Sequence, residues 1–332
     1  MSNTLLTYIV PVYNTEAYVL RCLQSIMNQG LGDDDYEVIV VDDGSIDDSK
    51  DVVKQFAAQH PQVHLFSQEN AGVSAARNYA LDKAVGRYVQ FVDSDDYLEA
   101  GTIATLLQRA IGDDLDVLIF NSCSVMPSGD YAVLGVKHAT TPVVVGVEYL
   151  MNHDMTPYVW RYMVSRDFLN RLHFRFNTKL IVCEDGELIA RFMLNASRVA
   201  HQDTTSYCYV RRGESAMHNQ NPNHLRRRIF SQIDSAIAIN ETIKRYENMS
   251  GKPAPVSVSG LRNVYLYFSM TKALSIGCVD EAVQRMKQAD LFPFPCVGPE
   301  ANYRGVKWKI IHGLMMCPGL WRGLSKVYRM IK

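Results

Sequence analysis

The sequence predicts an α/β protein with a doubly wound, mostly parallel sheet, followed by a helical extension at the C-terminal end. Over roughly the first hundred residues, short apolar runs rich in β-forming residues alternate with segments of helical spacing. From residue 221 onward, apolar residues recur only at helical spacing. Strands that alternate with helices at this rhythm are typical of a parallel sheet covered by helices on both faces.

The elements of this fold can be placed in order along the chain. The strands expected first are Leu5–Val10, Glu37–Val41, Val63–Phe66 and Tyr88–Val92, and the helices between them are Glu16–Gln29, Asp47–Ala58 and Gly72–Val85. Then follow helix Glu99–Ala110, strand Leu115–Phe120, a hairpin of Cys123–Met126 and Tyr131–Val136, helix Gly146–Asn152, a helix from Cys183 to Asn195, and strand Thr204–Val210. The last helices run from Asn221 to a stop at Gly251, then over Val258–Ile276 and Val279–Ala289. We therefore expect one α/β domain over 1–218 and a helical region over 219–332.

Composition narrows the class of protein. The chain has 332 residues, enough for one large domain or one domain with an extension, and its 47% hydrophobic and 21% charged content is ordinary for a globular protein. A net charge of -1 gives no basic field for nucleic acid, so no nucleic-acid partner is expected. The seven cysteines form no Cys-x-x-Cys pair, which predicts neither a zinc site nor a disulfide framework but reduced thiols in the cytoplasm.

Targeting signals are not expected in this sequence. No cationic region precedes the first apolar run, Leu5–Val12, as a secretory signal would require. No apolar stretch approaches the roughly 20 residues of a membrane-spanning helix. The sequence therefore predicts a cytoplasmic protein.

Three carboxylates lie within four residues directly after the fourth strand. They belong to Asp93, Asp95 and Asp96, and like charges this close repel unless a positive charge lies among them. One interpretation is a divalent cation that shares its oxygen ligands with a phosphate. The other is an acidic turn that caps the helix beginning near Glu99.

Polar residues also follow two other strands, at Tyr13-Asn14 and Asp42-Asp43. Ligands of parallel α/β sheets bind beyond the carboxyl ends of the strands, so these residues and the acidic stretch should converge on one cleft. The chain contains neither Gly-x-Gly-x-x-Gly after its first strand nor Gly-x-x-x-x-Gly-Lys, which disfavours a dinucleotide-binding Rossmann enzyme and a P-loop ATPase. A metal ion on Asp95 could neutralise a pyrophosphate where no glycine-rich loop does.

Four motifs together resemble the series found in family 2 glycosyltransferases of the GT-A fold. They are Pro11-Val12-Tyr13-Asn14, Val41-Asp42-Asp43-Gly44-Ser45, Asn70-Ala71-Gly72-Val73-Ser74-Ala75-Ala76-Arg77-Asn78 and Asp93-Ser94-Asp95-Asp96. Their order and spacing match over roughly the first hundred residues, whereas each motif alone would be a weak signal. The resemblance implies a nucleotide-sugar donor, an inverting mechanism and a bound Mn²⁺ or Mg²⁺ ion.

The resemblance also implies roles for residues on the donor side. Asp43, with Asp42 beside it, is suited to accept the imide N–H of uracil, although Asp42 could instead be a plain turn residue. Arg77 could bind the nucleotide or its phosphates, or form an ion pair with Asp42 or Asp43. Asp93 could reach ribose hydroxyls, and Asp95 would bind the metal. The complete donor-side set is Pro11, Val12, Tyr13, Asp42, Asp43, Arg77, Asp93, Ser94 and Arg211, with Asp95 and His218 as metal ligands.

The remaining site residues lie on the acceptor side. Trp160 could stack on a sugar face, or it could be a core residue. Glu184 and Asp185 open a helix, where carboxylates are favourable for electrostatic reasons alone. In the resembled family this pair marks the catalytic base, so the resemblance assigns that role to Asp185 and places Glu184 beside the acceptor. Inversion needs one such base to deprotonate the attacking hydroxyl.

The C-terminal tail differs from the rest of the chain in charge. Residues 304–332 contain four Lys and three Arg but no Asp or Glu, and their apolar residues recur at helical spacing around Pro318. A basic amphipathic segment with tryptophans suits an anionic membrane surface, which would place the protein peripherally on the inner face of the plasma membrane. The alternatives are a helix packed on the domain or a homodimer interface.

The sequence thus predicts a metal-dependent, inverting glycosyltransferase that extends a bacterial surface polysaccharide. The expected donor is a UDP-sugar, the group transferred is a hexosyl or N-acetylhexosaminyl group, and the acceptor is a glycan or a lipid-linked glycan. A nucleotidyltransferase is the alternative enzyme, although the first loop lacks the glycine-rich, basic character that this class requires. A non-catalytic nucleotide-binding module is the alternative outside enzymes, but carboxylates at both Asp95 and Asp185 argue against it.

Overall fold

The structure is a computed structural model of the chain and describes residues 4–134, 137–211 and 221–291. The chain divides into two compact units, which we describe separately. Unit 1 contains Met1–Tyr149, Tyr158–Thr178 and Asn195–Ser215, and unit 2 contains Leu150–Pro157, Lys179–Leu194 and Ala216–Lys332.

Unit 1 is built on a nine-stranded sheet with the order β3-β2-β1-β4-β8-β6-β9-β5, and β7 pairs with β6. Its first half is parallel, as the sequence predicts. These strands are β1 (Leu6–Val12), β2 (Tyr36–Asp42), β3 (Val63–Ser67) and β4 (Tyr88–Phe91). The register pairs Val12 with Asp42 and Ile9 with Phe91, so β1, β2 and β4 end at the same edge of the sheet.

The second half of the sheet is mixed. Its strands are β5 (Tyr97–Leu98), β6 (Val117–Val125), β7 (Tyr131–Val133), β8 (Tyr162–Ser165) and β9 (Val199–Val210). β8 lies antiparallel between β4 and β6, whereas β9 is parallel to β6. The hairpin expected around residue 128 forms between β6 and β7. The strands predicted separately at Leu115–Phe120 and Cys123–Met126 are one continuous strand, β6. The predicted α/β class is therefore confirmed, with a larger antiparallel part than expected.

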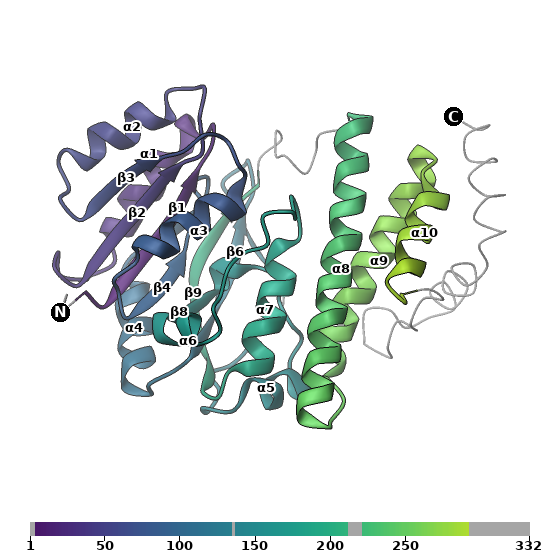
Figure 1. The fold of residues 1–332 in the computed structure, drawn as a ribbon. Helices are drawn as coiled ribbons and strands as arrows, with labels where there is room; N and C mark the ends of the chain where they lie inside the picture. The colour runs from purple at the N-terminus through teal and green to yellow at the C-terminus, as the bar shows by residue number, and fades with distance from the viewer. Residues whose placement is uncertain (1–3, 135–136, 212–220, 292–332) are drawn as a thin grey trace. The chain divides into compact units, whose positions relative to one another are not determined.

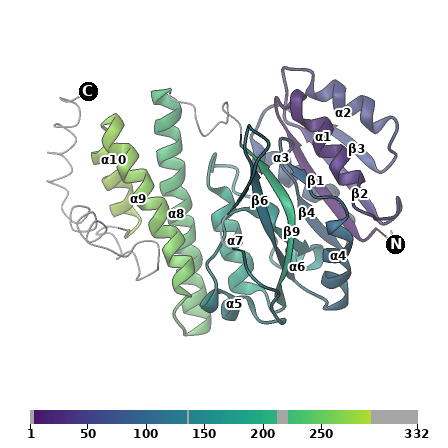
Figure 2. The same ribbon diagram turned by 180° about the vertical axis from the view of Figure 1, so that it is seen from behind.

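Helices cover both faces of this sheet (Figures 1 and 2). The main core lies between one face and α1 (Glu16–Met27), α2 (Ser49–Ala57) and α4 (Thr102–Gly112). Alternate residues of β1, such as Leu6, Tyr8 and Val10, point into this core because side chains on a strand alternate between faces. α3 (Val73–Lys83) lies on the opposite face, where it contacts β1 and β2. Shorter helices are α5 (Gly146–Asn152), the 3₁₀ turn η1 (Val159–Arg161) and α6 (Arg166–Arg171).

Unit 2 is helical, as predicted. It contains α7 (Glu184–Asn195) except its last residue, and α8 (Pro222–Ser250), α9 (Val256–Ile276) and α10 (Val279–Gln288). The side chain of Asn221 accepts hydrogen bonds from two backbone N–H groups and caps α8, and Gly251 ends α8 with a φ of 65°. Both ends of α8 agree with the predicted helix boundaries. α8 and α9 pack against each other along their lengths.

The predicted boundary after residue 218 is close to the last passage from unit 1 to unit 2, at Ser215/Ala216. Unit 2 also includes two earlier segments, Leu150–Pro157 and Lys179–Leu194. Consequently, the predicted base Asp185 belongs with the C-terminal helices. The basic tail 304–332 and the predicted metal ligand His218 lie outside the described residues.

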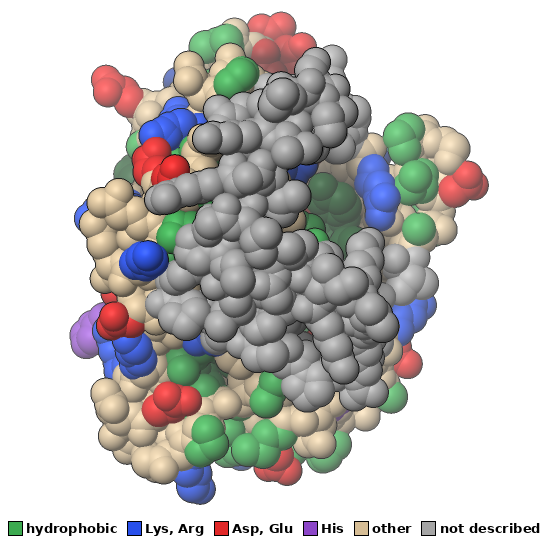
Figure 3. Space-filling view, turned by 90° about the vertical axis from the view of Figure 1, so that its right-hand side faces the viewer, with side chains coloured by type: hydrophobic (Ala, Val, Ile, Leu, Met, Phe, Trp, Pro, Cys, Tyr) green, Lys and Arg blue, Asp and Glu red, His purple; other side chains and the backbone are tan. Residues whose placement is uncertain are grey.

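Two surface properties can be checked on the described residues. None of their helices is both long enough and apolar enough to pass through a membrane. On the face drawn in Figure 3, the described basic and acidic side chains are interspersed and do not form one continuous basic patch. This agrees with the net charge of -1.

Candidate active site

The structure brings together the three strand ends at which the sequence predicts a site. The backbone N–H of Asp43, after β2, donates to the carbonyl oxygen of Val12 in β1 at 2.8 Å. The hydroxyl of Thr15, after β1, donates to the Ser94 hydroxyl after β4 at 3.0 Å, and both side chains are buried. Segments from three separate strands therefore form one polar region at the carboxyl edge of the parallel half-sheet.

The turn after β1 is held by Asn14. This residue has a φ of 51°, a left-handed conformation that asparagine tolerates better than most side chains. Its backbone N–H donates to the Ser45 hydroxyl at 3.1 Å, and its side-chain oxygen accepts from the N–H of Ile46 at 2.9 Å. These bonds fix the loop after β1 against the loop after β2. They leave Tyr13 about half exposed, as a base-lining side chain would need to be.

The Asp43 carboxylate is buried, with 3% of the residue exposed. One oxygen accepts from the Gln68 amide at 2.7 Å and from the N–H of Ala71 at 2.9 Å, and the other accepts from the N–H of Gly72 at 2.8 Å. Asp43 therefore holds the loop that leads into α3. Because a carboxylate has about four acceptor positions, these three bonds leave room for one further donor. Asp42 is also buried and accepts from the Ser45 N–H at 3.1 Å, as a turn residue would.

Arg77 pairs with Asp93, and not with Asp42 or Asp43 as the sequence suggested. Its terminal nitrogen lies 2.8 Å from a carboxylate oxygen of Asp93, and its guanidinium lies over the Phe176 ring at 5.2 Å from the centroid. Only 4% of the Arg77 side chain is exposed, against 29% for Asp93. The arrangement makes Arg77 a positioning residue for the more exposed Asp93 carboxylate.

Asp96 links the acidic stretch to β9. Its carboxylate accepts from the Tyr207 hydroxyl at 2.7 Å and from the N–H of Val210 at 2.7 Å. The same hydroxyl accepts from the backbone N–H of Asp93 at 3.1 Å, so Tyr207 connects both ends of the stretch. Burial, and then the negative charges of Asp95 and Asp93, raise the pKa of Asp96 well above its usual range. A strong negative potential therefore exists beside the carboxylates of Asp93 and Asp95.

This negative potential and the type of donor fit a hard divalent cation. Asp93 and Asp95 are both partly exposed at the end of β4, and both offer carboxylate oxygens. Oxygen donors of this kind suit Mg²⁺ or Mn²⁺. A cation at this position would also oppose the charges that raise the pKa of Asp96. The carboxylates present at this position therefore fit the predicted metal ion.

Trp160 is a core residue, so its predicted stacking on an acceptor sugar is not supported. Only 3% of the residue is exposed. Its ring is nearly parallel to that of Tyr207, with centroids 4.1 Å apart, and to that of Tyr158, at 4.9 Å. The indole therefore packs against Tyr207, whose hydroxyl holds the acidic stretch. In this stack of rings, Tyr158 is substantially exposed to solvent.

Arg211 lies one residue beyond the Val210 N–H that binds Asp96. Its own N–H donates to the carbonyl oxygen of Val125 at 2.9 Å, and its side chain is exposed. A cationic side chain is therefore available close to the acidic stretch in the fold. The segment that follows in the chain, residues 212–220, lies outside the described part of the structure.

The start of α7, which carries Glu184 and Asp185, is fixed within unit 2. Cys183 precedes it with a φ of 62°, a strained conformation for a non-glycine residue. Two serines of α8 hold this turn: Ser231 accepts from the N–H of Val182 at 3.1 Å, and Ser235 donates to the carbonyl oxygen of Cys183 at 2.7 Å. Burial raises the pKa of the Cys183 thiol to about 12, so this cysteine is a structural residue and not a nucleophile.

Sequence reasoning missed the residues that hold these carboxylates in place. The local pattern places Tyr207 in a strand but does not show that its hydroxyl meets the acidic stretch, because this contact arises from pairing between distant segments. Ser231 and Ser235 had a visible signal, because they are polar residues four positions apart within the buried face of α8. Such an interruption of an apolar stripe indicates a side chain with a specific partner.

We expect Tyr207→Phe to destabilise unit 1. The change removes the hydroxyl that bonds the buried Asp96 carboxylate and the Asp93 N–H, which should lower the free energy of unfolding by about 1–3 kcal/mol. Tyr8→Phe is the matched control, because Tyr8 is equally buried but its hydroxyl has no hydrogen-bond partner among the described residues. Urea unfolding of both variants measures the difference. Equal stability of the two would contradict this role of Tyr207.

Comparisons with known proteins give a consistent result. Residues 7–156 match the family model "Glycosyl transferase family 2". The uncharacterised glycosyltransferase YibD of Escherichia coli is 30% identical over 233 residues, which cover 68% of this chain and 65% of YibD. The minor teichoic acid biosynthesis protein GgaB of Bacillus subtilis is 30% identical over 220 residues, which cover 65% of this chain and 24% of GgaB. The chain thus spans less than two thirds of the length of these two relatives.

Solved structures resemble the whole fold. Residues 1–349 of TarS from S. aureus, in complex with UDP, superpose with a TM-score of 0.67 at 21% identity. The superposition covers 99% of this chain and 92% of that one. A second structure of the same TarS segment, in complex with UDP-GlcNAc, gives a TM-score of 0.68 at 20% identity, covering 99% of this chain and 93% of that one. At this level of identity the likeness establishes the fold.

Proposed function

Because this chain belongs to the family 2 glycosyltransferases, we propose that it transfers a sugar from a UDP-sugar donor, with inversion, to a growing surface glycan. The observation that carries the proposal is the meeting of three strand ends at one edge of the parallel half-sheet. It places Asp43, Asp93 and Asp95 within one hydrogen-bonded region of unit 1. Binding beyond the carboxyl ends of strands is the general location of ligands in such sheets.

The donor side of the site is proposed residue by residue. Asp43 would accept the uracil imide with its remaining acceptor position, because its other three are used by the loop before α3. The exposed ring of Tyr13 would pack on the base. The exposed oxygen of Asp93, oriented by Arg77, would accept from ribose hydroxyls. Arg211 would bind the diphosphate, since its exposed guanidinium can form paired hydrogen bonds to phosphate.

Asp95 would hold the divalent cation, with further oxygens from the donor itself. When bound, Mn²⁺ or Mg²⁺ supplies Lewis-acid stabilisation of the negative charge that develops on the departing diphosphate. The role of the protein is to fix the position of the Asp95 carboxylate. The bonds from Asp96 to Tyr207 and Val210 serve this purpose, because they anchor the neighbouring residue of the same turn.

The chemistry of transfer needs one base from the chain. The acceptor hydroxyl oxygen forms a bond to C1 of the sugar, the bond between C1 and the diphosphate oxygen breaks, and UDP leaves with that electron pair. We propose that the carboxylate of Asp185 takes the hydroxyl proton. The anchored turn before α7 supports this role, because Ser231 and Ser235 fix the backbone from which Asp185 projects. Glu184, beside it, would contact the acceptor.

We expect Gly186→Ala to reduce transfer by displacing this turn. A Cβ at this position would lie 2.5 Å from the Tyr265 hydroxyl oxygen and 2.9 Å from its Cε2 atom, too close for either group to stay in place. Because Gly186 follows Asp185 directly, the clash should misplace the base. A shift of about 1 Å can cost about 100-fold in rate. Steady-state kinetics with the donor at saturation measures this effect.

Gly112→Ala is the matched control for this substitution. Gly112 is the last residue of α4, and a Cβ there would meet nothing within 4 Å. Alanine stabilises a helix by up to about 1 kcal/mol relative to glycine, so this variant should be at least as stable as the parent and fully active. Unchanged activity of Gly186→Ala would show that the turn before α7 does not position the base.

We propose a surface glycan as the acceptor and a hexosyl or N-acetylhexosaminyl group as the sugar that is transferred. The match to GgaB supports a cell-surface polymer or its lipid-linked precursor as acceptor. The basic charge of residues 304–332 supports contact with an anionic membrane where a lipid-linked acceptor would lie.

Incubation of the purified chain with Mn²⁺ and individual UDP-sugars tests the proposed function. The proposal predicts release of UDP, slowly to water and faster once an acceptor glycan is added. Release of pyrophosphate would indicate a nucleotidyltransferase instead. Binding of UDP without turnover of any UDP-sugar, in the presence of acceptor glycans, would indicate a non-catalytic nucleotide-binding module.

A further inference from the structure

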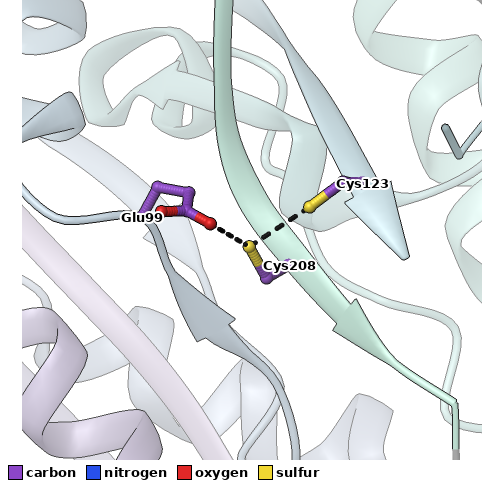
Figure 4. Close-up of side chains that lie close together, drawn as sticks. All are labelled: Glu99, Cys123 and Cys208. Carbon is purple, nitrogen blue, oxygen red and sulfur yellow. Dashed lines mark hydrogen bonds between the residues drawn. The ribbon is translucent and has the colours of Figure 1, made fainter. Parts of the chain in front are cut away.

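A second cluster of metal-binding side chains lies in unit 1 and involves none of the residues proposed to bind the donor. It consists of Glu99, Cys123 and Cys208, whose ligand atoms all lie within 4.8 Å of one another. Figure 4 shows the three side chains pointing toward one another from three segments of the fold. Glu99 follows β5, Cys123 belongs to β6 and Cys208 to β9.

The sheet itself brings the two cysteines together. Cys123 and Cys208 are register partners in the parallel pair of β6 and β9, although 85 residues separate them in the chain. Their sulfur atoms are 3.3 Å apart, and the Cys208 thiol donates to the Glu99 carboxylate at 3.1 Å. Both cysteines are buried, whereas Glu99 is partly exposed. The sequence predicts no zinc site because it contains no Cys-x-x-Cys pair, whereas these two cysteines come together through strand pairing.

A cavity gives access to the cluster. It has a volume of about 470 Å³ and is lined by Glu99 and Cys123, together with Ala100, Thr102, Tyr131, Ala132, Lys137 and Thr205. Lys137 is exposed and adds a positive charge at the rim. An ion could therefore reach the Glu99 carboxylate and the Cys123 thiol from this cavity, and a fourth ligand such as water could occupy the side that opens to it.

We propose that Glu99, Cys123 and Cys208 form a binding site for a thiophilic divalent cation such as Zn²⁺. Two thiolates and one carboxylate with an open fourth position are a donor set that zinc accepts in proteins. Tetrahedral zinc with its usual bond lengths would place two sulfur ligands about 3.8 Å apart, and a sulfur and an oxygen about 3.5 Å apart. The separations of 3.3 Å and 3.1 Å are slightly shorter, so small side-chain adjustments would admit the ion.

A metal accounts for the cluster better than a disulfide does. A disulfide would join the two sulfurs but leave the Glu99 carboxylate without the thiol that it now accepts from. A cation uses all three groups at once, and it compensates the charges of two thiolates beside a carboxylate. Soft sulfur ligands favour Zn²⁺ over the Mn²⁺ or Mg²⁺ expected at Asp95, so the two sites should select different ions.

Titration of the reduced full-length chain with Co²⁺ or Cd²⁺ alone tests this site, with a thiol-free reductant and without oxygen. We expect a thiolate-to-metal charge-transfer band that saturates at one equivalent, together with release of protons. Zn²⁺ should displace the probe ion, whereas excess Mn²⁺ should not. The band should be lost in Cys123→Ser and Cys208→Ser. Cys278→Ser is the matched control, because this partly buried cysteine belongs to unit 2 and should leave the band unchanged.

Glu99→Gln guards against variants that fail to fold. It keeps the size of the side chain and both thiols, so the charge-transfer band should persist. Loss of a group that only hydrogen-bonds a metal ligand costs about 10- to 100-fold in metal affinity, and loss of the Glu99 carboxylate should cost more than this. Zn²⁺ should raise the melting temperature of the parent and of Cys278→Ser, but not that of the double serine variant.

Three results would overturn the site: no charge-transfer band in the reduced parent protein, the same band in the double serine variant, or unchanged affinity in Glu99→Gln. Loss of two thiols on exposure to peroxide, in a chain that binds no metal when reduced, would identify the pair as a redox couple instead. None of these results depends on glycosyl transfer, so they are independent of the proposed function.

Discussion

Asp185→Asn should abolish most transfer while donor binding is retained. The amide cannot take the acceptor proton, and general-base catalysis contributes about 100- to 10,000-fold to rate, so kcat should fall by a factor in that range. The Kd for the UDP-sugar should not change, because the proposed donor contacts all come from unit 1. Steady-state kinetics with acceptor, and calorimetric titration with donor, measure the two quantities.

A control variant tests whether the carboxylate of Asp185 only stabilises the N-terminus of α7. Asp185 is the second residue of α7, and Asp280 is the second residue of α10. A carboxylate at this position stabilises a helix by about 0.3–1 kcal/mol, so both Asp→Asn changes should lower stability by similar amounts. Asp280→Asn should nevertheless remain fully active. Weakened donor binding in Asp185→Asn, or transfer within tenfold of the parent, would contradict its role as the base.

Asp95→Ala should eliminate the metal-dependent part of donor binding. The change removes the proposed cation ligand, so the affinity for UDP in the presence of Mn²⁺ should fall to the value measured in its absence. Removal of a group that only hydrogen-bonds a metal ligand lowers metal affinity by about 10- to 100-fold, and we expect removal of the ligand itself to lower it further. Titration calorimetry with UDP, with and without Mn²⁺, measures this difference and does not require turnover.

Asp34→Ala is the matched control for Asp95→Ala. Asp34 is an exposed carboxylate in the loop before β2, at the opposite end of the strands from the acidic stretch. Its removal changes the net charge by the same amount and should leave the manganese dependence of UDP binding unaffected. If Asp95→Ala binds UDP with the same manganese dependence as Asp34→Ala, then Asp95 is not the metal ligand.

The parallel half of the sheet and the C-terminal helices could be predicted because their signals are local. Each parallel strand is a short apolar run, and each helix has apolar residues at helical spacing within one segment. The caps of α8 at Asn221 and Gly251 are likewise determined by single residues. The rule that ligands bind beyond the carboxyl ends of parallel strands then sufficed to bring the three polar strand ends together.

The antiparallel part of the sheet could not be predicted in the same way. β8 is only four residues long, and it lies between β4 and β6 through pairing with segments far away in the chain. β5 has two residues and exists only because β9 pairs with it. Such strands have no distinct periodicity of their own, so their assignment depends on tertiary context.

Tertiary packing also decides between alternatives that the sequence leaves open. For Trp160 these are stacking on a sugar and packing in the core, and the ring of Tyr207 from β9 packs against the buried indole. For Arg77 the alternatives are contact with the nucleotide or its phosphates and an ion pair with Asp42 or Asp43, and the ion pair that forms is with Asp93. The ring partner of Trp160 belongs to β9, far away in the chain, whereas Arg77 and Asp93 are only 16 residues apart and meet because α3 packs beside the end of β4.

We propose above all that the acidic strand ends of unit 1 bind the diphosphate of a sugar nucleotide together with a divalent cation. Thermal melting of the parent chain with UDP-GlcNAc, UDP-GalNAc, UDP-Glc and UDP-Gal, each with and without Mn²⁺, tests it most directly. Because a ligand that binds only the folded state stabilises it, at least one UDP-sugar should raise the melting temperature, and the rise should be larger when Mn²⁺ is present. No shift with any of the four, or the same shift without Mn²⁺, would contradict the claim.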